Sequence, residues 1–195
     1  MATAHEARPT DEKHERFDGS RGPRTVGPSD GRFVELGSLG IRFMVWGEEA
    51  GGGFSLVEHP IPPRALAAPL HRHAREDEYS YVIEGRMGAQ LGDDVLYAGP
   101  GDLVFKPRGQ WHTFWNAGDA PCRILEIISP AGFEHYFAEL GDAMADQSSP
   151  NPGAALAHSD LPARYAIEFQ RESIAQLCET HGLWFPGLSA TPGRT

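Results

Sequence analysis

Short strand-like runs follow one another from residue 41 to residue 129, and this feature constrains the fold more than any other. Each run has four to eight residues, and turn residues such as Gly92–Asp94 and Asn116–Asp119 separate several of them. No helical pattern interrupts the series. Many short strands at close spacing are typical of an antiparallel sandwich or barrel. We therefore predict an all-β domain with strands at 41–46, 54–61, 70–73, 78–85, 86–92, 94–98, 102–107, 112–116 and 122–129.

The two flanks differ from this region in composition. Residues 1–32 are rich in charge, glycine and proline and have no hydrophobic period, which predicts a flexible tail. After Ser129-Pro130 the pattern becomes helical, with a Pro/Ser linker at 146–154. We predict a barrel over 33–130 and a helical extension over 131–195. Its helices, at 132–145, 161–169 and 172–181, should pack outside the barrel or across its mouth.

Charge and cysteine content exclude several classes of protein. A net charge of −10 argues against nucleic acid as a partner, because phosphate binding needs a cationic surface. No apolar run is long enough to span a bilayer, and the N-terminal residues contain no apolar segment of signal-peptide type. We therefore expect a cytoplasmic protein without a membrane partner. Cys122 and Cys178 are more consistent with two free thiols than with a disulfide framework.

Four residues have the chemistry and spacing of a metal site. His71 and His73 stand two positions apart, so on a strand both imidazoles point to the same face. Glu78 follows after four intervening residues, and His112 comes 34 positions later. Three neutral imidazoles and one carboxylate suit divalent iron, manganese, nickel, cobalt, copper or zinc. The expected cofactor is thus a divalent transition metal.

Two longer segments contain these residues, PLHRHAREDEYSYVIEG and GDLVFKPRGQWHTFWN. They resemble the paired signature of the cupin superfamily, G-x5-H-x-H-x3,4-E-x6-G and G-x5-P-x-G-x2-H-x3-N. The only departure is Ala65, which stands where the first pattern opens with glycine. The resemblance covers about residues 40–130. It implies a double-stranded β-helix (jelly-roll) barrel that holds a metal through His71, His73, Glu78 and His112, with the short C-terminal helices packed outside.

Strand alternation predicts the wall of a substrate pocket around that metal. Glu78 is the candidate catalytic residue, since a carboxylate either ligates the metal or rotates away to act as a general base. For Lys106 we consider two alternatives: its stem lies along the wall while the ammonium reaches solvent, or the ammonium is an electrostatic partner for an anionic substrate. Trp111 and Trp115 are predicted to cover the mouth. The predicted pocket residues are Ser80, Val82, Phe105, Lys106, Trp111 and Phe114.

Three functions are compatible with such a site. The first is a dioxygenase-like oxidoreductase, similar to the quercetin-dioxygenase-like cupins, acting on a small oxygenated or aromatic molecule chelated to the metal. The second is an isomerase, lyase or cyclase that uses the same ligands without oxygen. The third is a non-catalytic small-molecule-binding protein, because fold alone does not decide function. Barrels cover their edge strands, so we also expect a homodimer formed through residues 33–60.

Overall fold

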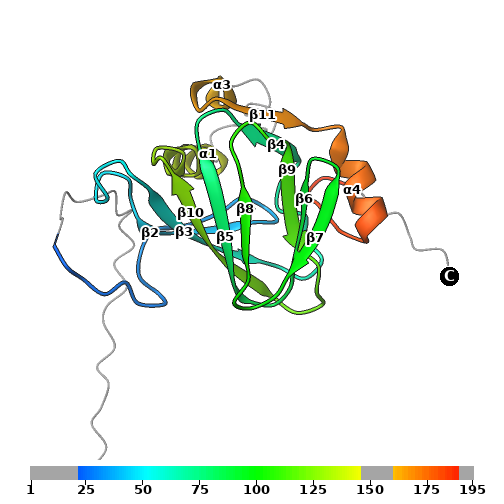
Figure 1. Ribbon diagram of the computed structural model, residues 1–195, viewed down its shortest axis with the longest axis horizontal. Helices are drawn as coiled ribbons and strands as arrows, with labels where there is room; N and C mark the ends of the chain where they lie inside the picture. Colours follow the sequence, from blue (N-terminus) through cyan, green and yellow to red (C-terminus); the bar gives the residue numbers. More distant parts are fainter. Residues whose placement is uncertain (1–21, 146–159, 189–195) are drawn as a thin grey trace, which may run out of the picture.

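The computed structural model describes residues 22–145 and 160–188, which form two facing antiparallel sheets (Figure 1). The six-stranded sheet has the order β1 (Phe33–Glu35), β2 (Gly40–Val45), β3 (Ser55–Ile61), β10 (Cys122–Ser129), β5 (Asp77–Glu84) and β8 (Leu103–Lys106). The five-stranded sheet has the order β11 (Ile167–Gln170), β4 (Leu70–His73), β9 (His112–Asn116), β6 (Met87–Leu91) and β7 (Asp94–Ala98). This arrangement is a jelly-roll barrel.

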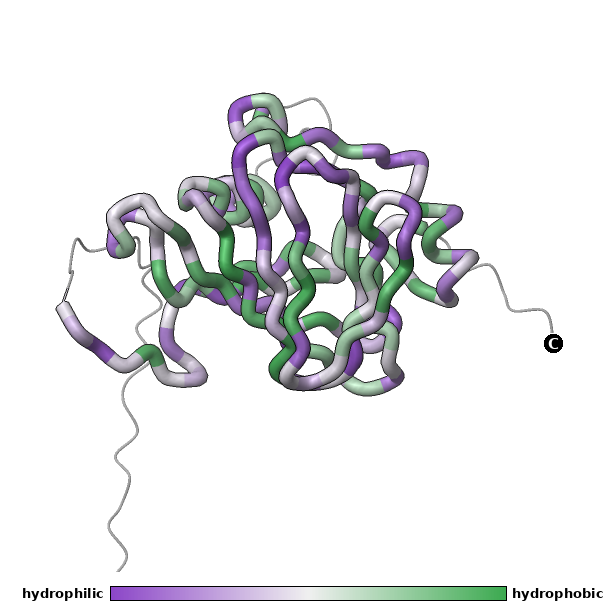
Figure 2. The backbone as a smooth tube through the Cα atoms, in the orientation of Figure 1, coloured by the Kyte–Doolittle hydropathy of each residue, from purple (hydrophilic) through white to green (hydrophobic). Residues whose placement is uncertain are grey.

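All nine predicted strand segments are confirmed, each with both ends within one residue of the predicted positions. Alternation along the strands explains the agreement, because one set of side chains enters the barrel while the other faces out. In β10, for example, Cys122, Ile124, Glu126 and Ile128 are buried and the residues between them are only half-buried. Figure 2 shows the same switching between hydrophobic and hydrophilic residues along the barrel strands.

Asn116, the asparagine of the second signature segment, links two loops through its side chain at the end of β9. Its side chain is fully buried, and its amide nitrogen lies 2.8–3.1 Å from the carbonyl oxygens of Ile61, Pro62 and Ala120. Its side-chain oxygen accepts a 2.8 Å hydrogen bond from the backbone N–H of Gly118. Asn116 therefore satisfies backbone groups of two loops that would otherwise be buried without partners.

The backbone around Ala65 shows why alanine can stand where the cupin signature has glycine. Ala65 is completely buried and forms an isolated bridge with Trp184. The left-handed conformation in this turn is adopted by the preceding residue, Arg64, with φ of 57°. Alanine is therefore compatible with position 65.

Three helices lie in the C-terminal region that the structure describes: α1 (Glu134–Ala145), α3 (Leu161–Arg164) and α4 (Ser173–His181). Gly182, in the left-handed region with φ of 65°, ends α4 as its sequence position predicted. Helix α4 packs on the outer side of the five-stranded sheet, and α1 lies beside the six-stranded sheet (Figure 1). The predicted linker at 146–154 and the tail residues 1–21 lie outside the described residues.

The predicted helix over 161–169 is wrong in its second half. The helix ends at Arg164, Ala166 has φ of 51°, and the chain continues as β11, which pairs antiparallel with β4. Pairing satisfies the backbone groups along the edge of β4 and places Glu168 beside Arg72, with which it forms an ion pair. This long-range pairing outweighs the local helical pattern. As a result, β11 becomes part of the barrel rather than of an outer helical layer.

Candidate metal centre

The four predicted ligands come together inside the barrel from both sheets. His71 and His73 lie on β4, His112 lies opposite His71 on β9, and Glu78 reaches across from β5. All four are buried, and one ligand atom from each lies within 4.8 Å of the other three. The spacing of the two sequence segments thus translates into one compact cluster of three nitrogen donors and a carboxylate.

Backbone carbonyl groups orient two of the imidazoles. Nδ1 of His71 lies 2.8 Å from the carbonyl oxygen of Pro69, and Nδ1 of His112 lies 3.0 Å from that of Gln110. Because a carbonyl oxygen only accepts hydrogen bonds, each Nδ1 must carry the proton. The lone pair is then on Nε2, and Nε2 of His112 lies 3.2 Å from Glu78 Oε2. Such outer hydrogen bonds are the usual way in which proteins hold metal-binding histidines.

His73 provides the strongest indication of a metal. It is fully buried, and neither ring nitrogen has a hydrogen-bond partner among residues 22–145 and 160–188. Its Nε2 lies 3.3 Å from Glu78 Oε1. Burial lowers the pKa of His73 to about 4, and burial together with the neighbouring histidines lowers the pKa of His71 well below its usual range. Both rings are therefore neutral at physiological pH, which is the form that binds a metal. The four residues fit a divalent transition metal.

A buried ion array adjoins this cluster. Lys106 Nζ lies 2.9 Å from Glu78 Oε2 and 3.1 Å from Glu126 Oε1, while Ser80 Oγ donates a 2.7 Å hydrogen bond to Glu126 Oε2. All of these side chains are at most 5% exposed. The alternative in which the Lys106 ammonium reaches solvent is therefore wrong. Its charge is matched by two carboxylates inside the barrel, because Lys106 pairs in register with Glu78 on the neighbouring strand.

The array also determines the charge states of its members. Burial alone would raise the pKa of Glu78, but Lys106 and the neighbouring histidines lower it well below its usual range. Burial raises the pKa of Glu126 to about 7 although Lys106 opposes the shift. Burial disfavours the Lys106 cation, yet Glu126 and Glu78 raise its pKa. At neutral pH, Glu78 is thus an anion and Lys106 a cation.

A cavity of about 330 Å³ opens beside the cluster and is within the size range of small-molecule sites. His71 and Glu78 contribute polar atoms from the metal cluster, and His59 and Glu126 contribute polar groups from β3 and β10. Most of the remaining wall is apolar and includes Phe114 and residues of α1, α3 and β11, and Arg171 adds one charged side chain. The donor cluster therefore faces a largely apolar chamber.

The predicted pocket residues divide into two groups. Ser80, Val82 and Lys106 are buried on the inner face of the six-stranded sheet, and Phe114 lines the cavity itself. Phe105 points outward: it is 47% exposed and stacks on Tyr79 at 4.9 Å between ring centroids. Adjacent strand residues face opposite ways, so the inward position of Lys106 excludes Phe105 from the pocket.

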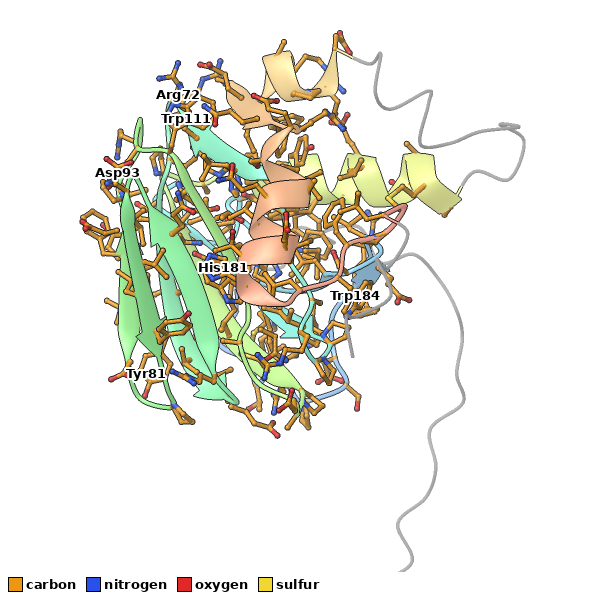
Figure 3. The ribbon with its side chains drawn as sticks, turned by 90° about the vertical axis from the view of Figure 1, so that its right-hand side faces the viewer. Arg72, Tyr81, Asp93, Trp111, His181 and Trp184 are labelled. Atoms are coloured by element: carbon orange, nitrogen blue, oxygen red, sulfur yellow. The ribbon has the colours of Figure 1, made fainter. Side chains whose placement is uncertain are left out.

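Neither tryptophan covers the mouth as predicted. The Trp111 ring lies outside the barrel with the Arg72 guanidinium 4.9 Å from its centroid (Figure 3). Trp115 is buried on the outer face of β9 beneath α4, where it stacks on His181 at 4.4 Å. In both cases, the residue alternates with an inward neighbour of β9, so that its ring must face away from the metal cluster.

Sequence reasoning missed Glu126, His59 and the aromatic wall supplied by α1 and the residue before it. The signal for Glu126 was present, since it is the one charged residue among the inward positions of β10. His59 stands before Pro60 on a strand, and the sequence does not indicate which face it occupies. The wall residues Phe133, Tyr136 and Phe137 showed only an apolar helical stripe, which carries no information about the surface it covers.

A jelly-roll barrel with three inward histidines and an inward glutamate defines a class of small β-barrel proteins with an interior site suited to a metal. Residues 58–128 match the cupin domain family Cupin_2, which identifies this region of the barrel as a cupin domain. No helix within the described ranges is long and apolar enough to cross a membrane.

Two curated proteins resemble part of the chain. The tetracenomycin polyketide synthase protein TcmJ of Streptomyces glaucescens is 33% identical over 85 residues, which are 44% of this chain and 54% of that protein. An uncharacterized protein of Methanocaldococcus jannaschii is 29% identical over 86 residues, 44% of this chain and 67% of that one. The matched segment thus spans about half the length of TcmJ.

Solved structures agree in fold. A predicted oxalate decarboxylase from Thermotoga maritima superimposes with a TM-score of 0.52 at 18% identity, covering 55% of this chain and 99% of that one. KdgF from Halomonas gives a TM-score of 0.51 at 16% identity, covering 58% and 99%. At these identities the likeness concerns the barrel alone.

Proposed function

We propose that this protein is a metal-dependent enzyme, a dioxygenase-like oxidoreductase acting on a small oxygen-bearing molecule that is largely apolar, either aromatic or enolisable. The observation that carries the proposal is the opening of the donor cluster onto the apolar cavity. A substrate can place its body against the aromatic wall while it presents an oxygen to the metal. A small number of polar groups in a mainly apolar chamber is the usual composition of a small-molecule site.

The residues have separable roles in this proposal. A divalent metal held by His71, His73, Glu78 and His112 would act as a Lewis acid that lowers the pKa of a bound hydroxyl. Glu78 would accept the proton released there, since its carboxylate lies within the donor cluster. Lys106 holds Glu78 through the 2.9 Å ion pair, and the apolar wall excludes water. Exclusion of water strengthens each of these electrostatic interactions.

A second candidate, a cyclase, isomerase or lyase that needs no oxygen, is favoured by one observation. TcmJ, which is 33% identical to part of this chain, is named as a polyketide synthase protein, and polyketide chains are rich in enolisable carbonyl groups. The same proton acceptor and Lewis acid would promote carbon–carbon bond formation without net oxidation. A binding protein without turnover is the third possibility.

Oxygen consumption separates these candidates. Metal-loaded protein would be incubated with flavonols and catechols in air and under strict anaerobiosis, with an oxygen electrode and product chromatography as readouts. A dioxygenase consumes one oxygen molecule per product and stops without oxygen. Product formation that continues anaerobically would select the cyclase, isomerase or lyase, and tight binding without product would select the binding protein.

Glu78→Gln tests the proton acceptor in whichever reaction is observed. Glutamine keeps the shape and an oxygen donor but loses the charge and most of the basicity. We expect partial metal retention and a turnover number lower by about 10²–10⁴, the usual scale for removal of a general base. Metal content and kcat would be measured on the same preparation, so that loss of metal is separated from loss of basicity. Wild-type turnover in this variant would leave Glu78 as a ligand only.

We further propose a homodimer through residues 33–60. Strand β1 lies at the edge of the six-stranded sheet, and an uncovered edge presents unpaired backbone groups. Light scattering at micromolar concentration should give twice the chain mass of 21.3 kDa. A monomeric mass at that concentration would contradict the proposal.

A further inference from the structure

His59, on β3, is a buried cavity residue outside the metal cluster. Its Nδ1 lies 3.0 Å from the carbonyl oxygen of Gly40, so this nitrogen carries the proton and donates it. Nε2 therefore presents a lone pair. The ring is 1% exposed, lines the cavity and lies between Phe114 and Phe137, with centroid distances of 6.0 and 5.6 Å. Within the described ranges, no hydrogen-bond donor reaches Nε2.

Glu126 lies on the same inner face. His59 is paired with Ile124 and Glu126 with Val57, so the two polar residues occupy neighbouring positions on adjacent strands. The Glu126 carboxyl group also contacts the cavity, and its oxygens face the Ser80 hydroxyl and the Lys106 ammonium. This part of the wall thus offers a hydrogen-bond acceptor at His59 and a carboxyl group beside it. Its other surroundings are apolar.

We propose that His59 Nε2 accepts a hydrogen bond from an O–H or N–H group of the substrate, which makes His59 a specificity-determining residue. The inference rests on the proposed function and deepens it by naming the substrate class: a mainly apolar molecule with a hydroxyl or amino donor besides the oxygen that it presents to the metal. An acceptor group of the ligand would leave two buried lone pairs facing each other, which is costly.

The test uses metal-free protein, so that it does not depend on turnover. The probes are 2-naphthol and 2-methoxynaphthalene, which share a ring system but differ in hydrogen-bond donation. Binding would be followed by fluorescence titration. We expect wild-type protein to bind 2-naphthol about five- to tenfold more tightly, the scale of one buried hydrogen bond. Absence of this preference, or failure of 2-naphthol to bind, would overturn the inference.

Variants at position 59 then assign the preference to one atom. His59→Asn retains an N–H at the position of Nδ1, which can still donate to Gly40, but has no group at the position of Nε2. We expect the ratio of the two dissociation constants to fall to about one. In His59→Gln, the amide reaches the position of Nε2 and its oxygen should keep a preference of about the wild-type size. An unchanged ratio in the asparagine variant, or its loss in the glutamine variant, would contradict the role of Nε2.

Phe137→Leu is the matched control, because it alters the apolar wall beside His59 without a polar change. It should weaken both probes to a similar extent and leave their ratio unchanged. A changed ratio in this variant would place the preference in the shape of the wall and overturn the inference. Donor preference without any metal-dependent turnover would support the role of His59 while counting against the proposed enzyme.

Discussion

Replacing Lys106 by methionine is expected to destabilise the metal-free protein by about 3–5 kcal/mol, the usual cost of removing one partner from a buried ion pair. The ammonium lies between Glu78 and Glu126, and its removal leaves two carboxylates close together inside the barrel. Methionine keeps the volume of the stem, so the loss is mainly electrostatic. Urea unfolding at pH 9 would measure it. Glu126 has a pKa of about 7 while Lys106 lowers it, and loss of the ammonium raises that pKa further, so the measurement needs a pH well above 7.

The partner variant Lys106→Met/Glu126→Gln isolates that electrostatic contribution. It removes one positive and one negative charge, so it should recover much of the stability lost in Lys106→Met. As the pH falls from 9, the single variant should also recover, because Glu126, whose pKa lies above 7 once Lys106 no longer lowers it, takes up a proton and loses its charge. A bound divalent metal should reduce the loss as well, since it replaces the ammonium as the counter-charge of Glu78.

Arg108→Met is the control for a generic lost ion pair. Arg108 pairs with Asp77 at 2.7 Å, but its side chain is 50% exposed. Exposed pairs contribute at most about 1 kcal/mol, so this variant should unfold close to wild type. A Lys106→Met protein as stable as Arg108→Met would show that the buried array carries no net electrostatic stabilisation.

The double variant His71→Ala/His73→Ala should lose its metal almost completely, from about one ion per chain to a small fraction. Two of four donors disappear, and the remaining His112 and Glu78 leave too few ligands for stable binding. The barrel should still fold, because its apolar core lies in other residues. Elemental analysis after dialysis, with circular dichroism of the same sample, would measure both properties.

His135→Ala provides the histidine control. This side chain is 38% exposed and lies near Glu48 and Glu134, outside the barrel. We expect the variant to retain about one metal per chain. Full metal content in the double variant would refute the assignment of the barrel site. Loss of metal from His135→Ala would place the ion instead at the group formed by Glu48, Glu134 and His135.

Local sequence patterns were sufficient to predict the features that depend only on residues close together in the chain. The positions of His71 and His73 on one face, the nine strands and the turn at Gly182 all follow from the spacing of side chains along a short segment. The metal cluster itself could be predicted because two spaced patterns resemble those of a known superfamily. Alternation also predicts that the adjacent residues Phe105 and Lys106 point to opposite faces of their strand. Only one of them can therefore line the pocket, although both were assigned to it.

Sequence by itself therefore determined the barrel, nine of its strands and the identity of the candidate ligands. Only the tertiary structure decided that Lys106 pairs with Glu126, that His59 faces the cavity, and that residues 167–170 form a strand. The physical reason is the same in each case. Periodicity specifies the face to which a side chain points, whereas its partner depends on the register between strands that are distant in the chain. For β11, the free edge of β4 supplied the backbone partners that overrode the local helical pattern.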